Sequence, residues 1–147
     1  MPSRKLSIVF DSVTFVSAFI TPGGLAAELL RLCEEQAELC TAEEILMETR
    51  EVLLERPHLR RRFSYSSAQV EQFIEMLRAE YRVITPLPPL DGVVRDPEDD
   101  MIIACAVAVG ADYIVSRDRD LLDLGGYKEV KIVSPETLMQ IMRGHHN

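Results

Sequence analysis

The sequence predicts an α/β protein, folded as a three-layer α/β/α sandwich around a mostly parallel central sheet. Short, largely apolar runs alternate with longer segments of helical periodicity, and this alternation is typical of parallel sheets covered by helices. The chain has 147 residues and is 47% hydrophobic, which suits one core. We therefore expect a single domain over 1–147, with frayed ends at 1–4 and 144–147.

The first half begins with a strand and three segments of helical periodicity. Residues 6–10 form an apolar run that ends at Asp11, as expected for a short buried strand. A helical segment follows it, and a second one at 25–36 places its leucines on one face. Thr41 and Glu44 have the spacing of a capping box and predict the start of a third helix.

The rest of the first half is punctuated by proline. The third helix should end near Arg56, because Pro57 disfavours helical geometry in the residue before it. Residues 57–63 are then expected to be a basic connector. A further helix begins near Ser66, whose hydroxyl can cap it. A brief strand at 82–84 leads into a proline-rich loop.

The second half shows the clearest pattern. Residues 101–109 are almost wholly apolar, which predicts a helix buried on most sides. Strands at 112–116 and 130–133 flank a short helix at 121–124. Ser134 then supplies a cap for the last helix, whose first position is a proline.

Composition excludes several classes of protein. Three cysteines without a CxxC pair fit neither a disulfide scaffold nor a zinc ribbon, and they favour a reducing, cytoplasmic setting. No apolar run approaches the ~18 residues that span a bilayer, so we expect no membrane association. No P-loop motif is present. The net charge of −8 argues against nucleic-acid binding through overall charge, but a local basic patch stays open.

Acidic side chains gather at one predicted edge of the sheet. Ligands of open α/β sheets bind beyond the carboxyl ends of the strands. Asp11 directly follows the first strand. Asp118 and Asp120 follow the strand at 112–116, and Asp99 begins the apolar helix that leads into that strand. If these two strands are neighbours, acids that are distant in the sequence converge.

Glu48 is a further candidate, because it borders the apolar stripe of its helix and a carboxylate there is costly unless its charge is compensated. Structural explanations stay open for each acid. Asp11 and Asp118 can cap the helices that follow them. The acids near Asp99 suit a helix N-terminus, and Glu48 can reach water.

Converging carboxylates repel one another, so they either take up protons or bind a cation. Sites made only of oxygen suit Mg²⁺ or Mn²⁺, which bind phosphates and lower the pKa of bound water. The spacing of the acids therefore points to metal-assisted hydrolysis of a phosphodiester.

Three segments match the pattern of one family. Residues 11–18, D-S-V-T-F-V-S-A, resemble its opening D-T-N-V-L-V-S-A. Residues 44–53 resemble its second segment, whose internal glutamate falls on Glu48. Residues 96–122 resemble its third, D-P-D-D followed by A-D-Y-[IL]-V-[TS]-x-D-x-D-L-L. Over 6–137 the chain thus resembles the PIN-domain ribonucleases, and especially the VapC-like toxins of toxin–antitoxin pairs.

The resemblance implies a PIN-like fold and a Mg²⁺- or Mn²⁺-dependent endoribonuclease that cleaves RNA, forms a homodimer and is inhibited by a small antitoxin. The family's catalytic acids fall on Asp11, Glu48, Asp99 and Asp118. Its metal ligands correspond to Asp11, Asp99, Asp118 and Asp120. We expect accessory roles for Ser12, Ser116, Asp96 and Asp100.

A nuclease with this many acids needs cations near its cleft to hold RNA. The candidate RNA contacts are Arg60, Arg61, Arg62 and Arg117. Alternatively, the cluster at 60–62 is a solvated connector, and Arg117 balances neighbouring acids.

Val13 is the main departure from the family pattern, because it stands where the family has asparagine. A valine cannot make the hydrogen bonds of that carboxamide. Two interpretations therefore stay open: an active ribonuclease, and a catalytically impaired PIN-like module that binds RNA or protein. Cleavage of RNA by the purified protein with Mg²⁺ or Mn²⁺ would distinguish them.

Overall fold

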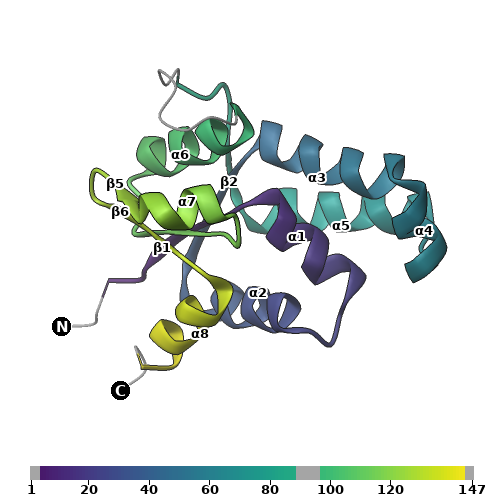
Figure 1. Ribbon diagram of the computed structural model, residues 1–147, viewed down its shortest axis with the longest axis horizontal. Helices are drawn as coiled ribbons and strands as arrows, with labels where there is room; N and C mark the ends of the chain where they lie inside the picture. The colour runs from purple at the N-terminus through teal and green to yellow at the C-terminus, as the bar shows by residue number, and fades with distance from the viewer. Residues whose placement is uncertain (1–3, 89–96, 145–147) are drawn as a thin grey trace.

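The computed structural model describes residues 4–88 and 97–144 (Figure 1). Within them the strands form one sheet in the order β3-β2-β1-β4-β6-β5, and only the β5–β6 pair is antiparallel. The strands are β1 (Ser7–Phe10), β2 (Glu38–Ala42), β3 (Arg82–Ile84), β4 (Tyr113–Val115), β5 (Gly126–Tyr127) and β6 (Val130–Val133). The prediction of an α/β/α sandwich with a mostly parallel sheet is confirmed.

Helices flank this sheet. They are α1 (Ser12–Ile20), α2 (Leu25–Gln36), α3 (Glu43–Glu55), α4 (Pro57–Phe63), α5 (Ser67–Glu80), α6 (Pro97–Val109), α7 (Arg119–Leu124) and α8 (Pro135–Gly144). The α6 helix packs against β1, β2 and β4, whereas α2 and α8 pack together on the other side of the sheet in Figure 1. Helices α1, α3 and α5 lie beside one another, and α4 lies at the end of the molecule remote from both termini.

The core sits where the apolar runs predicted it. All four residues of β1 are buried, and most of α6 beyond its first turn is buried as well. An aromatic chain continues from the sheet into the helices, with ring centroids 5.9 Å apart for Phe10 and Phe15 and 5.6 Å apart for Phe15 and Tyr81. Burial raises the pKa of both Cys33 and Cys105 to about 12, so both are structural thiols.

The predicted capping box at Thr41 and Glu44 is wrong. Thr41 lies inside β2, a strand that sequence reasoning missed, and pairs there with Val83 of β3. The N-cap of α3 is Ala42, which provides no side-chain hydrogen bond. Thr41 therefore pairs in the sheet and does not cap a helix, although the local sequence matches a capping box. The short strand β5 was missed as well, because two residues carry no periodicity.

The predicted basic connector at 57–63 is also wrong, because these residues form the helix α4. Pro57 occupies its first turn, where a missing amide hydrogen costs nothing, and Ser64 ends it in the left-handed conformation. No side chain of α4 is buried. The helix lies against α3 as an exposed projection.

The remaining predicted helices and strands are confirmed within a few residues, whereas part of the predicted proline-rich loop lies outside the described residues. Ser66 caps α5 in a complete capping box with Gln69. In the part of the chain that the structure describes, no single helix is long and apolar enough to cross a membrane. The single domain and frayed ends stay predictions, although Arg4 forms an ion pair with Asp112 at 2.8 Å and Gly144 belongs to α8.

Candidate active site

The two strands that precede the predicted acids are neighbours. Phe10 of β1 pairs with Val115 of β4 in parallel register, so Asp11 and Ser116 leave the sheet at the same edge. The amide of Asp11 still donates to the carbonyl oxygen of Val115, at 3.2 Å. The convergence of Asp11 and Asp118 required that these two strands be neighbours, and they are.

Asp11 is a buried carboxylate, only 3% exposed. Its Oδ1 atom accepts from the backbone amide of Thr14 at 2.8 Å and from the Thr14 hydroxyl at 2.6 Å. Its Oδ2 atom accepts from the Ser116 hydroxyl at 2.6 Å. Burial raises the pKa of Asp11, these hydrogen bonds oppose the rise, and the negative charge of Asp118 adds to it.

Ser116 connects Asp11 with the loop that carries Asp118. Its fully buried hydroxyl donates to Asp11 and accepts from the backbone amide of Asp118 at 2.9 Å. The Asp118 carboxylate is exposed and caps α7, accepting from the amides of Asp120 at 2.8 Å and Leu121 at 3.3 Å. One hydroxyl thus fixes a buried carboxylate relative to the loop that carries an exposed one.

A second contact links α1 to α3. The Ser12 hydroxyl donates to Oε1 of Glu48, and the two helices pack side by side. Ser12 is buried, whereas Glu48 is half-buried at the margin of its helix, as its place in the apolar stripe predicted. The structure therefore holds Glu48 beside the residue that directly follows Asp11.

Asp99 lies in the first turn of α6 and is buried, with 6% of its surface exposed. Asp100 beside it is half-buried. The helix that carries both packs against β1, β4 and α3, the elements that lead to the other acids. Asp96, expected to be an accessory residue, lies outside the described residues.

Hydrogen bonds join the parts of the site. They connect Asp11, Ser116 and the loop of Asp118, and they connect Ser12 with Glu48. Among residues 4–88 and 97–144, no three His, Cys, Asp or Glu side chains are grouped closely enough to hold a metal ion. The donor set is nonetheless all oxygen, the chemistry that Mg²⁺ and Mn²⁺ prefer. The assignment of metal ligands stays a prediction.

The structural explanations also hold for several residues. Asp11 caps α1 and Asp118 caps α7. Arg117 balances an acid, since it pairs with Glu136 at 2.7 Å. A cap, however, is normally exposed to solvent, and capping does not require Asp11 to be buried with a second carboxylate close enough to raise its pKa. That additional cost is typical of functional sites.

The arginine cluster lies on α4. Arg60 donates to the Ser67 hydroxyl at 2.8 Å, and the guanidinium of Arg62 lies over the Phe63 ring, 5.4 Å from its centroid. Arg61 and Arg62 are exposed. The cluster is therefore a positive surface on a helix rather than an extended linker.

Sequence reasoning missed the role of Thr14, and the effect of Val13 on activity stays a prediction. Thr14 holds Asp11 through two hydrogen bonds, which its position three residues after an N-cap aspartate could have indicated. Val13 is 57% exposed, and the hydrogen bonds described for the Asp11 carboxylate come from Thr14 and Ser116. The valine thus faces solvent, and Asp11 is well held without an asparagine there.

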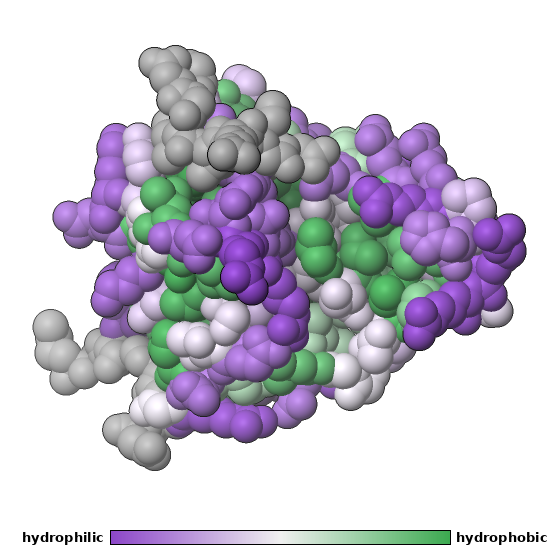
Figure 2. All heavy atoms as spheres, in the orientation of Figure 1, coloured by the Kyte–Doolittle hydropathy of each residue, from purple (hydrophilic) through white to green (hydrophobic). Residues whose placement is uncertain are grey.

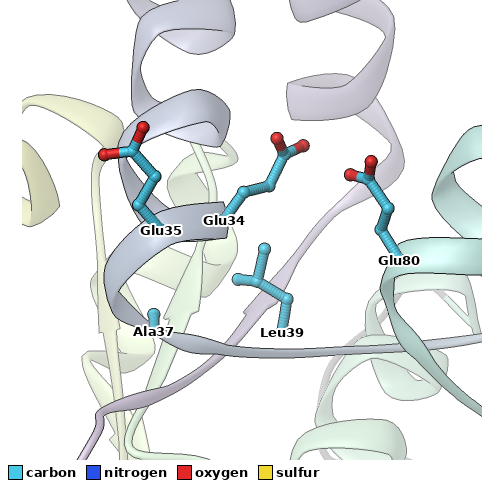
Figure 3. Close-up of a pocket in the computed structure, with 5 residues that line it drawn as sticks. All are labelled: Glu34, Glu35, Ala37, Leu39 and Glu80. Carbon is cyan, nitrogen blue, oxygen red and sulfur yellow. The ribbon is translucent and has the colours of Figure 1, made fainter.

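A second acidic group lies at the opposite, amino edge of the sheet. Glu34, Glu35 and Glu80 line a pocket there, and the carboxylates of Glu34 and Glu80 approach from α2 and α5 (Figure 3). Burial and the charge of Glu80 raise the pKa of Glu34. These acids end the helices that lead into β2 and β3, so they are separate from the candidate site.

Together, the doubly flanked parallel sheet and the acids at its carboxyl edge define a PIN-like α/β protein. The sequence matches a PIN-domain family model over residues 7–120, and the chain belongs to the PIN-domain family. Members of this family are generally nucleases and generally use divalent metal ions.

Comparison with solved structures supports the same fold. One similar chain comes from the VapBC2 complex of Rickettsia felis, which was crystallised with a DNA fragment from its promoter. The likeness covers 88% of this chain and 98% of that one, with a TM-score of 0.61 and 11% sequence identity. At this identity it concerns the fold. A search of curated proteins finds no match.

Proposed function

We propose that this protein is a metal-dependent endoribonuclease that hydrolyses phosphodiester bonds in RNA. The observation that supports it best is the buried Asp11 carboxylate, which Ser116 links to the loop of Asp118 at the carboxyl edge of the sheet. Membership of a family of nucleases adds to this support. A purely structural cap gains nothing from a second carboxylate close by, whereas a cation site requires one.

In this proposal each residue has a defined task. Asp11, Asp99 and Asp118 would hold the ion, with Asp120 beside them. A bound Mg²⁺ or Mn²⁺ supplies charge to the phosphate and a water of lowered pKa. Ser116 and Thr14 hold Asp11 in one orientation, and Ser12 holds Glu48.

We further propose that the protein is the toxin of a toxin–antitoxin pair, with a small antitoxin as its partner, a homodimeric assembly and a cytoplasmic location. The fold likeness to a VapBC2 chain supports the partner, since a complex of that name contains two kinds of chain. The buried, unpaired cysteines fit a reducing compartment.

Replacing the acids one at a time tests the proposed activity. The unmodified protein should cleave single-stranded RNA in Mg²⁺ or Mn²⁺ and stop when EDTA is added. Asp11→Asn, Asp99→Asn and Asp118→Asn should each reduce the rate by at least about 10²-fold, because each removes a ligand charge. Asp123→Asn, an exposed acid on α7, is the matched control and should retain full activity.

A second candidate is a PIN-like module that binds RNA or protein without cleaving it. Val13, which stands where the family has asparagine, is the feature that favours this candidate. RNA that stays intact with both metals, at several pH values and without any antitoxin, yet still binds the protein would support it. Equal activity in Asp118→Asn and the unmodified protein would remove Asp118 from the site.

A further inference from the structure

A pocket of about 260 Å³ lies between α1, α3 and α4, directly beside the candidate active site. It is smaller than the pockets of about 300–1,000 Å³ that bind whole small molecules, so its size suits one small group. Its lining includes Ser12, Val13, Glu48, Val52, Arg56, His58 and Leu59.

The pocket has both apolar and charged lining residues. Its apolar lining is aliphatic and comes from α1, α3 and α4, with Val13 the most exposed contributor. Figure 2 shows a hydrophobic surface at α1, near α3 and α4, bordered by hydrophilic residues. Arg56 and His58 are exposed at the pocket and can donate to phosphate or to the edge of a base.

The pocket adjoins the candidate active site. Ser12 and Glu48, which hydrogen-bond to each other, line it. A group in the pocket therefore lies next to Glu48, a proposed catalytic residue. Arg56 directly precedes α4, whose last turn carries Arg60, Arg61 and Arg62.

The charges around the pocket favour one approach of a nucleic acid strand over another. On the other side of the pocket, a hollow is lined by Glu48, Glu51, Val52, Glu55 and Arg56. Its three carboxylates outweigh the one guanidinium, so the hollow disfavours a phosphate backbone. A nucleic acid strand thus meets favourable charge from α4 and unfavourable charge from the outer face of α3. An approach over α4 places its next nucleotide at the pocket.

We propose that this pocket holds one unpaired nucleobase of the RNA next to the bond that is cleaved, with Val13, Val52 and Leu59 against the face of the base and with Arg56 and His58 at its phosphate. The proposal rests on the ribonuclease function proposed above. It gives Val13 a role of its own: where the family pattern has a carboxamide, this chain has an apolar surface for a base.

Binding without cleavage tests this proposal. The background is the full chain with Asp118→Asn, in EDTA, and the probe is a labelled single-stranded RNA of about ten nucleotides, within the range of single-strand site sizes. A second probe of the same length carries abasic ribose phosphates. Val13→Asn and Leu59→Ala should each weaken binding of the RNA about five- to tenfold and leave the abasic strand unchanged, because only base contacts are lost.

Two further variants complete the design. Arg56→Ala should weaken binding of both strands, because it removes a phosphate contact. Glu51→Gln, in the acidic hollow, is the control and should not weaken either. Thermal unfolding of each variant shows whether it is folded, and Val13→Asn is expected to fold normally because Val13 is exposed.

The alternatives give different results. Unchanged RNA affinity in both Val13→Asn and Leu59→Ala overturns the subsite, and it leaves the ribonuclease proposal intact if the unmodified protein still cleaves RNA. Equal weakening of both strands assigns the surface to the backbone alone. Unchanged RNA affinity with loss of self-association in sedimentation assigns this face to a second copy of the chain.

Discussion

Asp11 shows how one residue meets opposing demands. Its burial disfavours the charged form, while three hydrogen bonds from Thr14 and Ser116 favour that form. Burial has the largest effect, so the pKa of Asp11 lies above its ordinary value of 3.8. A carboxylate at this position therefore lowers the free energy of unfolding, as is common at catalytic sites.

The raised pKa of Asp11 makes a prediction about stability and pH. A carboxyl group that binds its proton more tightly in the folded state contributes stability below pH 3.8, and that contribution is lost as the pH rises through the folded pKa. Asp11→Asn cannot ionise, so its free energy of unfolding should rise relative to the unmodified protein between pH 3.8 and 7. Urea unfolding at several pH values measures this difference.

Asp123→Asn serves as the control here too, because Asp123 is exposed and should show no such trend. A constant difference between Asp11→Asn and the unmodified protein across this pH range would contradict the proposed cost of ionisation. The amide can retain the contacts of Oδ1 and donate to the Ser116 hydroxyl, so the variant should fold.

At the scale of elements, two similar patterns gave opposite outcomes. Thr41 and Glu44 match the capping box as well as Ser66 and Gln69 do, yet only the second pair forms one. The difference is tertiary, because Thr41 pairs with Val83 in the sheet. Sequence reasoning found the elements that have strong periodicity or local caps, and it missed those that depend on partners distant in the chain.

Thr41 and Ser66 give two linked predictions. Ser66→Ala should lower the free energy of unfolding by about 1 kcal/mol, the usual effect of losing an N-cap, and Ser66→Thr should restore most of it. Thr41→Val should be neutral or stabilising by about 1 kcal/mol, because the buried Thr41 hydroxyl has no hydrogen-bond partner among the described residues. Urea denaturation of the three variants tests both halves. A loss in Thr41→Val equal to that in Ser66→Ala would contradict the assignment of Thr41 to the sheet.

At the scale of the molecule, the candidate site combines parts that sequence alone could and could not place. The sequence placed Asp11 and Asp118 after two strands but left their pairing open, and the pairing of β1 with β4 brings both residues to one edge. The exposed helix α4 and the pocket beside it were not predictable, since they depend on how α1, α3 and α4 pack. A chain of net charge −8 thus carries a separate positive surface.

That positive surface predicts a salt dependence. Changing Arg60, Arg61 and Arg62 together to alanine should weaken RNA binding and lower the slope of log Kd against log salt by about 2, near 0.7 for each phosphate contact of a single strand. Arg143→Ala, on α8, is the control and should leave the slope unchanged. An unchanged slope in the triple variant would show that α4 does not contact RNA.

The hydroxyl bridge from Ser116 to Asp11 spans 105 positions of the chain and forms only after β4 has taken its place between β1 and β6. During synthesis, a polypeptide still emerging from the ribosome holds Asp11 long before the serine that orients it exists. A polypeptide that stops before Ser116 would consequently lack the hydroxyl that orients the Asp11 carboxylate, even with its first strands and helices already made.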